Sequence, residues 1–104
     1  MAVKEIINSD TTELEASKIA LLDIWATWCG PCKAIAPVVE SLSEEFAGKV
    51  DFFKADADEN PDLAKKFRVM SIPNLILFKD GKVAARHVGF QTADELKSWF
   101  ESNM

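Results

Sequence analysis

The sequence contains very little cysteine: only two of its 104 residues, Cys29 and Cys32, carry a thiol. Two cysteines are too few for a small secreted domain that is held together by several disulfides. A structural zinc site usually needs four ligands, and the single histidine, His87, lies far along the chain, so a metal site is disfavoured. Haem attachment is excluded, because Lys33 and not histidine follows the second cysteine.

The sequence also lacks an excess of positive charge and a long hydrophobic run. It has 12 Lys and Arg against 17 Asp and Glu, a net charge of −5, which disfavours non-specific binding to nucleic acid or to a membrane. No segment approaches the ~18 apolar residues of a membrane span. The first eight residues lack the apolar core of a signal peptide. We therefore expect a cytoplasmic protein, unless an export signal has been removed.

The remaining composition is that of an ordinary globular chain. Its apolar fraction is 48%, which is ample for one hydrophobic core. A chain of 104 residues has the length of one domain, and it contains neither an internal repeat nor a low-complexity linker. We expect residues 1–104 to form a single domain, with a monomer as the default state.

Hydrophobic patterns predict strands and helices in the order β-α-β-α-β-α-β-β-α. The nearly continuous apolar run 19–26 predicts a central strand that is covered on both faces. Asp80 and Gly81 predict a hairpin turn. Helices can cover both faces of a mixed sheet in this order, so the class is α/β. The predicted strands are 3–7, 19–26, 50–56, 75–78 and 83–88, and the predicted helices are 10–17, 35–46, 60–67 and one from residue 92.

Several residues predict where the helices begin and which way they face. Residues 10–13 and 92–95 each resemble a capping box, and Asn60 precedes a proline as an N-cap would. Pro37 predicts a kink in the second helix. In that helix the spacing predicts a buried face of Ile35, Val38, Val39, Leu42 and Phe46, with Lys33, Glu40, Ser43 and Glu44 facing solvent.

The two cysteines stand in residues 28–32, Trp-Cys-Gly-Pro-Cys, between a predicted strand and a predicted helix. Two α-carbons at positions i and i+3 of a helical turn lie ~5 Å apart, within the range of a disulfide. The free N–H groups and the dipole of the helix favour a thiolate on Cys29. Gly30 allows a tight turn, and Pro31 suits the first helical turn. A redox disulfide is predicted, with a static disulfide or two inert thiols as the alternatives.

Two charged residues interrupt apolar strands. Ionisation of Asp23 inside the run 19–26 would be costly, so its pKa is expected to be raised. Strand alternation places Asp23 on one face with Leu21 and Trp25. A structural aspartate bonded to backbone or water is the alternative. Lys54 lies in the strand 50–56, where a lysine can also simply extend its amine to solvent.

The motif at residues 28–32 makes the sequence resemble the thioredoxin family. The resemblance covers nearly the whole chain and implies the thioredoxin fold, a three-layer α/β/α arrangement with a central five-stranded mixed sheet and four helices. Two positions depart from the family pattern, since Asn74 stands where threonine is usual and Phe90 where a small residue is frequent. The residues that match are Asp23, Trp25, Pro37, Lys54, Asp56, Asp58, Ile72, Pro73, residues 78–81 and Gly89.

The resemblance implies a protein-disulfide reductase that carries two electrons. In it Cys29 would attack a target disulfide and Cys32 would resolve the mixed disulfide. Asp23 would accept the proton of Cys32, and Lys54 would modulate the proton affinity of Asp23. No cofactor would be bound, and a flavin-dependent thioredoxin reductase fed by NADPH would restore the thiols.

The resemblance also implies a groove for protein disulfides of varied sequence. It implies a cis bond before Pro73, which the ordinary frequency of cis proline would not predict. Val88 and Phe90 taken singly are more typical of a core, and His87 is expected to be a surface residue without chemistry. Open alternatives are an oxidant or isomerase of the same fold and a binding module with incidental cysteines. The groove residues would be Trp28, Gly30, Pro31, Ile72, Pro73, Val88, Gly89 and Phe90.

Overall fold

The computed structural model describes residues 3–104, and its elements follow the predicted order. The helix that carries the second cysteine begins at Gly30, ahead of the apolar pattern 35–46, so Pro31 lies in its first turn as predicted and Cys29 is its N-cap. The elements are β1 (Val3–Glu5), α1 (Thr12–Ala16), β2 (Ile19–Trp25), α2 (Gly30–Glu45), β3 (Asp51–Asp56), α3 (Pro61–Lys66), β4 (Asn74–Lys79), β5 (Lys82–Val88) and α4 (Ala93–Asn103).

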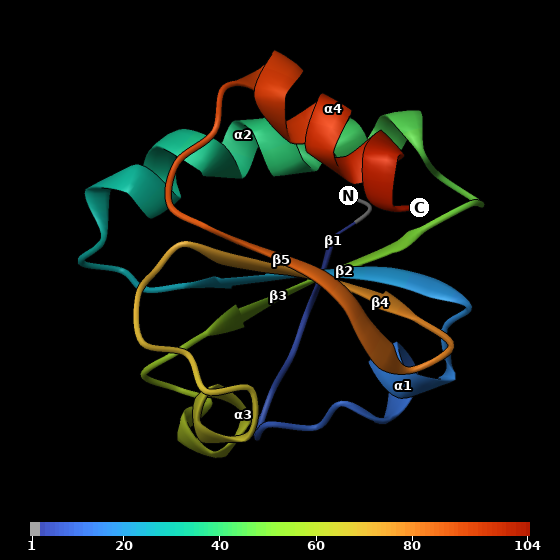
Figure 1. Cartoon of the computed structure of the whole chain (residues 1–104). Coiled ribbons are helices and arrows are strands. Elements are labelled where there is room, and N and C mark those ends of the chain that lie inside the picture. The colour runs from blue at the N-terminus through green and yellow to red at the C-terminus, as the bar shows by residue number, and fades with distance from the viewer. Residues whose placement is uncertain (1–2) are drawn as a thin grey trace.

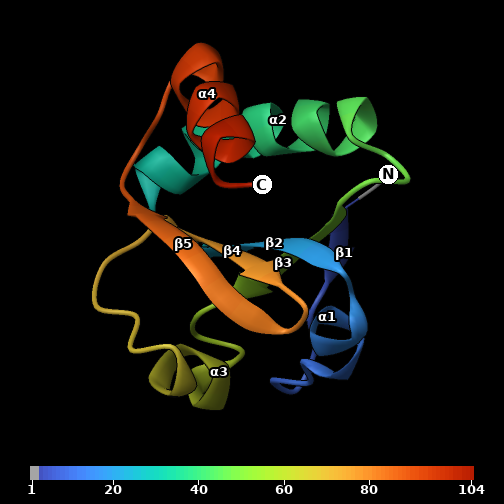
Figure 2. The same cartoon turned by 45° about the vertical axis from the view of Figure 1, so that its right-hand side comes forward.

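The five strands form one mixed sheet in the order β1-β3-β2-β4-β5. β3 pairs in parallel with β1 and β2, whereas β4 pairs antiparallel with β2 and β5. Helices α2 and α4 cover one face of the sheet, and α1 and α3 cover the other (Figures 1 and 2). The predicted fold class, a three-layer α/β/α arrangement with four helices, is confirmed.

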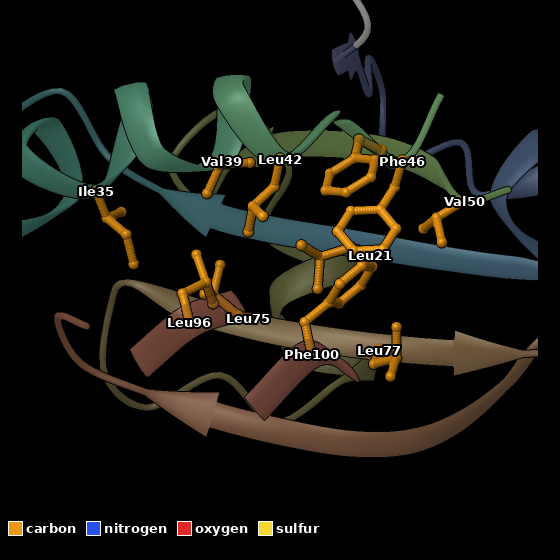
Figure 3. Close-up of a cluster of buried hydrophobic side chains, with 11 residues drawn as sticks. Leu21, Ile35, Val39, Leu42, Phe46, Val50, Leu75, Leu77, Leu96 and Phe100 are labelled. Atoms are coloured by element: carbon orange, nitrogen blue, oxygen red, sulfur yellow. The ribbon is translucent and has the colours of Figure 1, made fainter. Parts of the chain in front are cut away.

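Alternation along the strands divides the core into two layers. One layer lies between the sheet and α2 with α4, where side chains from both helices converge on those of β2 and β4 (Figure 3). In this layer Phe100 packs against Phe46 edge to face, with ring centroids 5.0 Å apart. The other layer lies against α1 and α3 and includes Leu22 and Ile76. Full burial of each such side chain stabilises the fold by about 1.5–3 kcal/mol.

The predicted helix starts and faces are only partly confirmed. Thr92 and Glu95 form the predicted capping box, but residues 10–13 do not, because the N-cap side chain of α1 makes no capping bond. The carboxylate of Asp10 instead accepts a hydrogen bond from the backbone of Thr12, at 3.0 Å. The predicted exposure of Ser43 is wrong: it is buried, and its hydroxyl donates to the carbonyl of Glu40 at 2.6 Å.

Asn60 occupies the predicted N-cap position of α3, but its side chain makes no capping bond. Its amide nitrogen donates to the carbonyls of Ile6 and Asp56, and its oxygen accepts from the backbone of Ser9 at 2.8 Å. The buried amide of Asn60 therefore connects two distant segments of the chain and does not cap α3. α2 continues through Pro37 from Gly30 to Glu45, and the kink there stays a prediction.

Candidate active site

The two cysteines lie where β2 ends and α2 begins, at one end of the sheet (Figure 1). The loop between α3 and β4 and the connection from β5 to α4 reach the same end of the molecule in both views (Figure 2). Cys29 and Cys32 form a disulfide with a Cα–Cα distance of 5.3 Å, and both residues are buried. The predicted spacing therefore holds a closed disulfide within one helical turn.

Cys29 is the N-cap residue of α2. Its sulfur accepts a hydrogen bond from the backbone N–H of Cys32 at 3.2 Å, and Pro31 lies in the first turn. No acidic residue stands in that turn, so the positive end of the helix dipole and a free N–H group both face the sulfur of Cys29. Negative charge on sulfur is stabilised at such a position.

Gly30 does not have the role that the sequence predicts. It lies inside α2 without a left-handed backbone, and a Cβ atom built on it would meet nothing within 4 Å. The turn itself therefore does not require glycine. The missing side chain leaves open space beside the first turn of α2.

Asp23 lies on β2 beneath the first turn of α2. It is 4% exposed, and burial raises its pKa to about 7, against an opposing effect from the positive charge of Lys54. The raised pKa is as predicted. Its Oδ1 is buried and has no hydrogen-bond partner among the described residues, so the backbone does not hold that atom.

A small cavity joins Asp23 to the second cysteine. The cavity has a volume of about 140 Å³ and is lined by Asp23, Trp25, Cys32, Lys33, Ala36 and Lys54. The lining is mainly apolar, but Asp23 and Lys54 supply polar groups, and a cavity of this size has room for water molecules. Asp23 and Cys32 thus border the same small space.

Lys54 is brought to Asp23 by the sheet. The two residues are register partners in the parallel pair of β2 and β3, so their side chains lie on the same face. The amine of Lys54 also lies 5.8 Å from the centroid of the Trp25 ring, within reach of a cation–π interaction. Lys54 is half-buried at the cavity rather than fully extended into solvent.

The loop before β4 faces the disulfide from the other side. The Ile72–Pro73 bond is cis, as the family resemblance implies. Ile72 packs against the cluster formed by Ala26 and the two cysteines. The carbonyl of Pro73 accepts a hydrogen bond from the N–H of Gly89 at 2.9 Å, which fixes the β5–α4 connection beside this loop.

Large apolar side chains are exposed around the disulfide. Val88 and Phe90 are 47% and 49% exposed. They are therefore surface residues, although each taken singly is more typical of a core. Trp28 is also exposed, and its indole N–H donates to the carboxylate of Asp58 at 2.8 Å. This hydrogen bond holds the tryptophan ring at the surface.

Sequence reasoning missed Met70. It is 93% exposed and borders an apolar cavity of about 400 Å³ that also includes Trp28 and Ile72. The only signal in the sequence is that Met70 stands two residues before Ile72. The remaining lining residues are Ala57, Ala64, Val69 and Ser71.

Two other residues neither line the cavity beside Cys32 nor pack against the cluster of the two cysteines. His87 is half-buried on β5, with its ring 6.1 Å from that of Trp99. Asn74 is buried at the start of β4, and its amide donates to the carbonyl of Ser71 at 3.3 Å. Asn74 thus supports the loop from beneath rather than lining the groove.

Nothing within residues 3–104 suggests a metal centre or a membrane helix. In that part of the chain no three His, Cys, Asp or Glu side chains are grouped to hold an ion. None of its helices combines the length and the apolar character that crossing a membrane requires.

Known proteins resemble the chain along its full length. A family model described as Thioredoxin matches residues 4–102. A protein named Thioredoxin from Staphylococcus haemolyticus is 48% identical over 104 residues, and one from Staphylococcus aureus is 46% identical, each covering 100% of both chains. The chain therefore belongs to the thioredoxin family, whose members exchange dithiols and disulfides as protein-disulfide oxidoreductases.

Proposed function

We propose that this chain is a general protein-disulfide reductase in which Cys29 is the nucleophile and Cys32 the resolving thiol. The observation that carries this assignment is the cap of α2, where the sulfur of Cys29 accepts the N–H of Cys32 in a turn without acidic residues. The thiolate is the reactive form of cysteine, and this environment favours it on Cys29.

The exchange moves two electrons from the chain to its target. The thiolate of Cys29 attacks one sulfur of the target disulfide, the target S–S bond breaks, and its other sulfur leaves as a thiolate that takes up a proton. The thiolate of Cys32 then attacks the sulfur of Cys29. This step forms the Cys29–Cys32 disulfide and releases the second target thiol, so the target is reduced and the chain is oxidised.

Asp23 is the proton acceptor for Cys32 in this proposal. Its pKa of about 7 lets it exchange a proton near neutral pH, and it shares the 140 Å³ cavity with Cys32. Lys54 borders the same cavity, and its charge keeps the pKa of Asp23 from rising further. Lys54 is therefore a positioning residue, which acts through Asp23.

The exposed apolar side chains around the disulfide suit a protein target. An extended segment can place its disulfide over Cys29 while its backbone pairs with the loop at Ile72 and Pro73. Few charged groups would be desolvated, so targets of varied sequence are accommodated. The proposed groove comprises Trp28, Gly30, Pro31, Ile72, Pro73, Val88, Gly89 and Phe90, together with Met70.

The setting of the reaction follows from this chemistry. Because the electrons reside in two thiols, the chain needs no bound cofactor, and we propose recycling by a flavin-dependent thioredoxin reductase that draws on NADPH. A reducing carrier of this kind belongs in the cytoplasm, where thiols are kept reduced. We further propose that residues 1–104 act as one domain and as a monomer.

A trapping experiment tests the two cysteine roles. Reduced Cys32→Ser protein should form a stable mixed disulfide with a disulfide-bonded target such as insulin, detectable on a non-reducing gel. The matched Cys29→Ser protein should form none. Trapping by Cys29→Ser alone would make Cys32 the nucleophile. Equal trapping by both variants would contradict distinct roles for the two cysteines.

The reduction potential tests the direction of electron flow. Thioredoxin itself has a potential of about −270 mV, whereas oxidants and isomerases lie at roughly −120 to −180 mV. Equilibration in thiol–disulfide buffers, followed by alkylation, measures this value. A potential in the higher range would make the chain an oxidant or isomerase. If a double Cys→Ser variant kept its cellular role, the chain would be a binding module.

A further inference from the structure

Met70 is the most exposed of the large apolar side chains in the described residues, at 93%. It lies in the loop between α3 and β4, outside regular secondary structure. The other described methionine, Met104, is 36% exposed and stands at the end of α4. The thioether of Met70 is thus the more open of the two to a small oxidant in solution.

The position of Met70 ties it to the reacting disulfide. Met70 borders the 400 Å³ apolar cavity together with Trp28 and Ile72. Trp28 precedes Cys29 in the chain, and Ile72 packs against the buried cysteine cluster. A protein that lies over Cys29 therefore covers this cavity, and the side chain of Met70 becomes part of the contact.

We propose that Met70 is a modification site, at which a peroxide converts the thioether to a sulfoxide and thereby weakens the docking of protein substrates. One oxygen of hydrogen peroxide bonds to the sulfur, the O–O bond breaks, and the other oxygen leaves as water. The sulfur loses two electrons and the peroxide gains them. This inference rests on the proposed function, because its consequence requires a target docked over Cys29.

The chemistry of the sulfoxide explains why docking and not electron transfer is affected. Oxidation turns a flexible apolar side chain into a polar one. A polar group that is enclosed between Trp28, Ile72 and an apolar target loses its contact with water, which costs free energy unless a donor replaces it. The two sulfur atoms of the disulfide are unchanged by the modification.

The test compares a protein substrate with a small one. The oxidised protein, whose cysteines are protected as the disulfide, is treated with hydrogen peroxide, and the peroxide is then removed. Peptide mass spectrometry should show faster sulfoxide formation at Met70 than at Met104. The KM for insulin should rise about fivefold at unchanged kcat. The rate with a small aromatic disulfide, which is too short to reach the cavity, should stay constant.

Matched variants separate the effect of Met70 from general damage. Each protein is compared with itself before and after peroxide, and the rise in KM should vanish in Met70→Leu but persist in Met104→Leu. Met70→Gln, which carries a polar side chain of similar length, should show the raised KM without peroxide.

Two results would overturn the inference: sulfoxide at Met70 with an unchanged KM, or no preference for Met70 over Met104. Both differ from a failure of the proposed function, in which the untreated protein would not reduce insulin at all.

Discussion

The N-termini of α2 and α4 are capped by the same hydrogen bond made with different atoms. In α2 the sulfur of Cys29 accepts the backbone N–H of Cys32 at 3.2 Å. In α4 the hydroxyl of Thr92 accepts the backbone N–H of Glu95, also at 3.2 Å. Each N-cap side chain therefore satisfies one of the free donors of its helix.

The surroundings of the two caps differ in charge. The first turn of α4 contains Asp94 and Glu95, and the carboxylate of Glu95 accepts a hydrogen bond from the backbone N–H of Thr92. The first turn of α2 contains no acid. Carboxylates already offset the positive end of the α4 dipole, whereas in α2 that field is left to act on sulfur. The same geometry thus gives a stabilising cap in one helix and, in the proposed function, the nucleophile in the other.

The largest effect is expected when α2 is given the hydroxyl cap of α4. Serine is a good N-cap, so Cys29→Ser should retain the helix, with a free energy of unfolding within about 1 kcal/mol of the reduced wild-type protein. Insulin reduction should be abolished, because a hydroxyl cannot exchange with a disulfide. Residual turnover above that of the double Cys→Ser variant would contradict the role of Cys29.

Asp23→Asn should have the next largest effect, because it removes the ionisable carboxyl group near the N-terminus of α2. Folded Asp23 keeps its proton up to about pH 7, against 3.8 as the ordinary value. The folded state therefore binds more protons between these values, and the free energy of unfolding falls as the pH rises from about 4 to 7, then levels off. The total decrease is on the order of 4 kcal/mol.

Asp23→Asn should remove that decrease and be the more stable protein at pH 8, as urea titrations at several pH values would show. Resolution of the mixed disulfide should slow by about 10²-fold, the usual contribution of a general base. A wild-type stability that is constant from pH 4 to 7 would show that Asp23 ionises freely.

Thr92→Ala should have a moderate effect on the α4 side of the comparison. Loss of the cap should lower the free energy of unfolding by about 1 kcal/mol, whereas Thr92→Ser should lose little of it. Insulin reduction should be the same in both variants. A change in redox activity would show that the two helix N-termini are coupled.

The smallest expected effect comes from placing an acid in the first turn of α2. Lys33→Glu imitates the acidic turn of α4 and should raise the pKa of the Cys29 thiol, because the carboxylate competes for the same field. A cost of about 0.3–1 kcal/mol corresponds to a roughly two- to fivefold slower alkylation at neutral pH. The rates are measured in a Cys32→Ser background, with Lys33→Gln as the control for loss of the lysine charge. Equal rates for both variants would assign the effect to the lost lysine alone.

Features that depend on a few neighbouring residues could be predicted from the sequence. The spacing of Cys29 and Cys32 sets a closable disulfide, and strand alternation places Asp23 on the face of Leu21. The capping box of Thr92 is likewise local. Each of these is decided by backbone periodicity over one or two turns or by a single strand, so no knowledge of distant segments is needed.

Only the tertiary structure decided which distant residues meet. The register of β2 and β3 brings Lys54 to Asp23, and the loop at Met70 and Ile72 returns to the cysteines some forty positions earlier in the chain. The side chain of Asn60 likewise bonds to the carbonyl of Ile6, a distant residue, instead of capping α3. Such contacts depend on strand order and on how loops close over a packed core, and local periodicity does not carry that information.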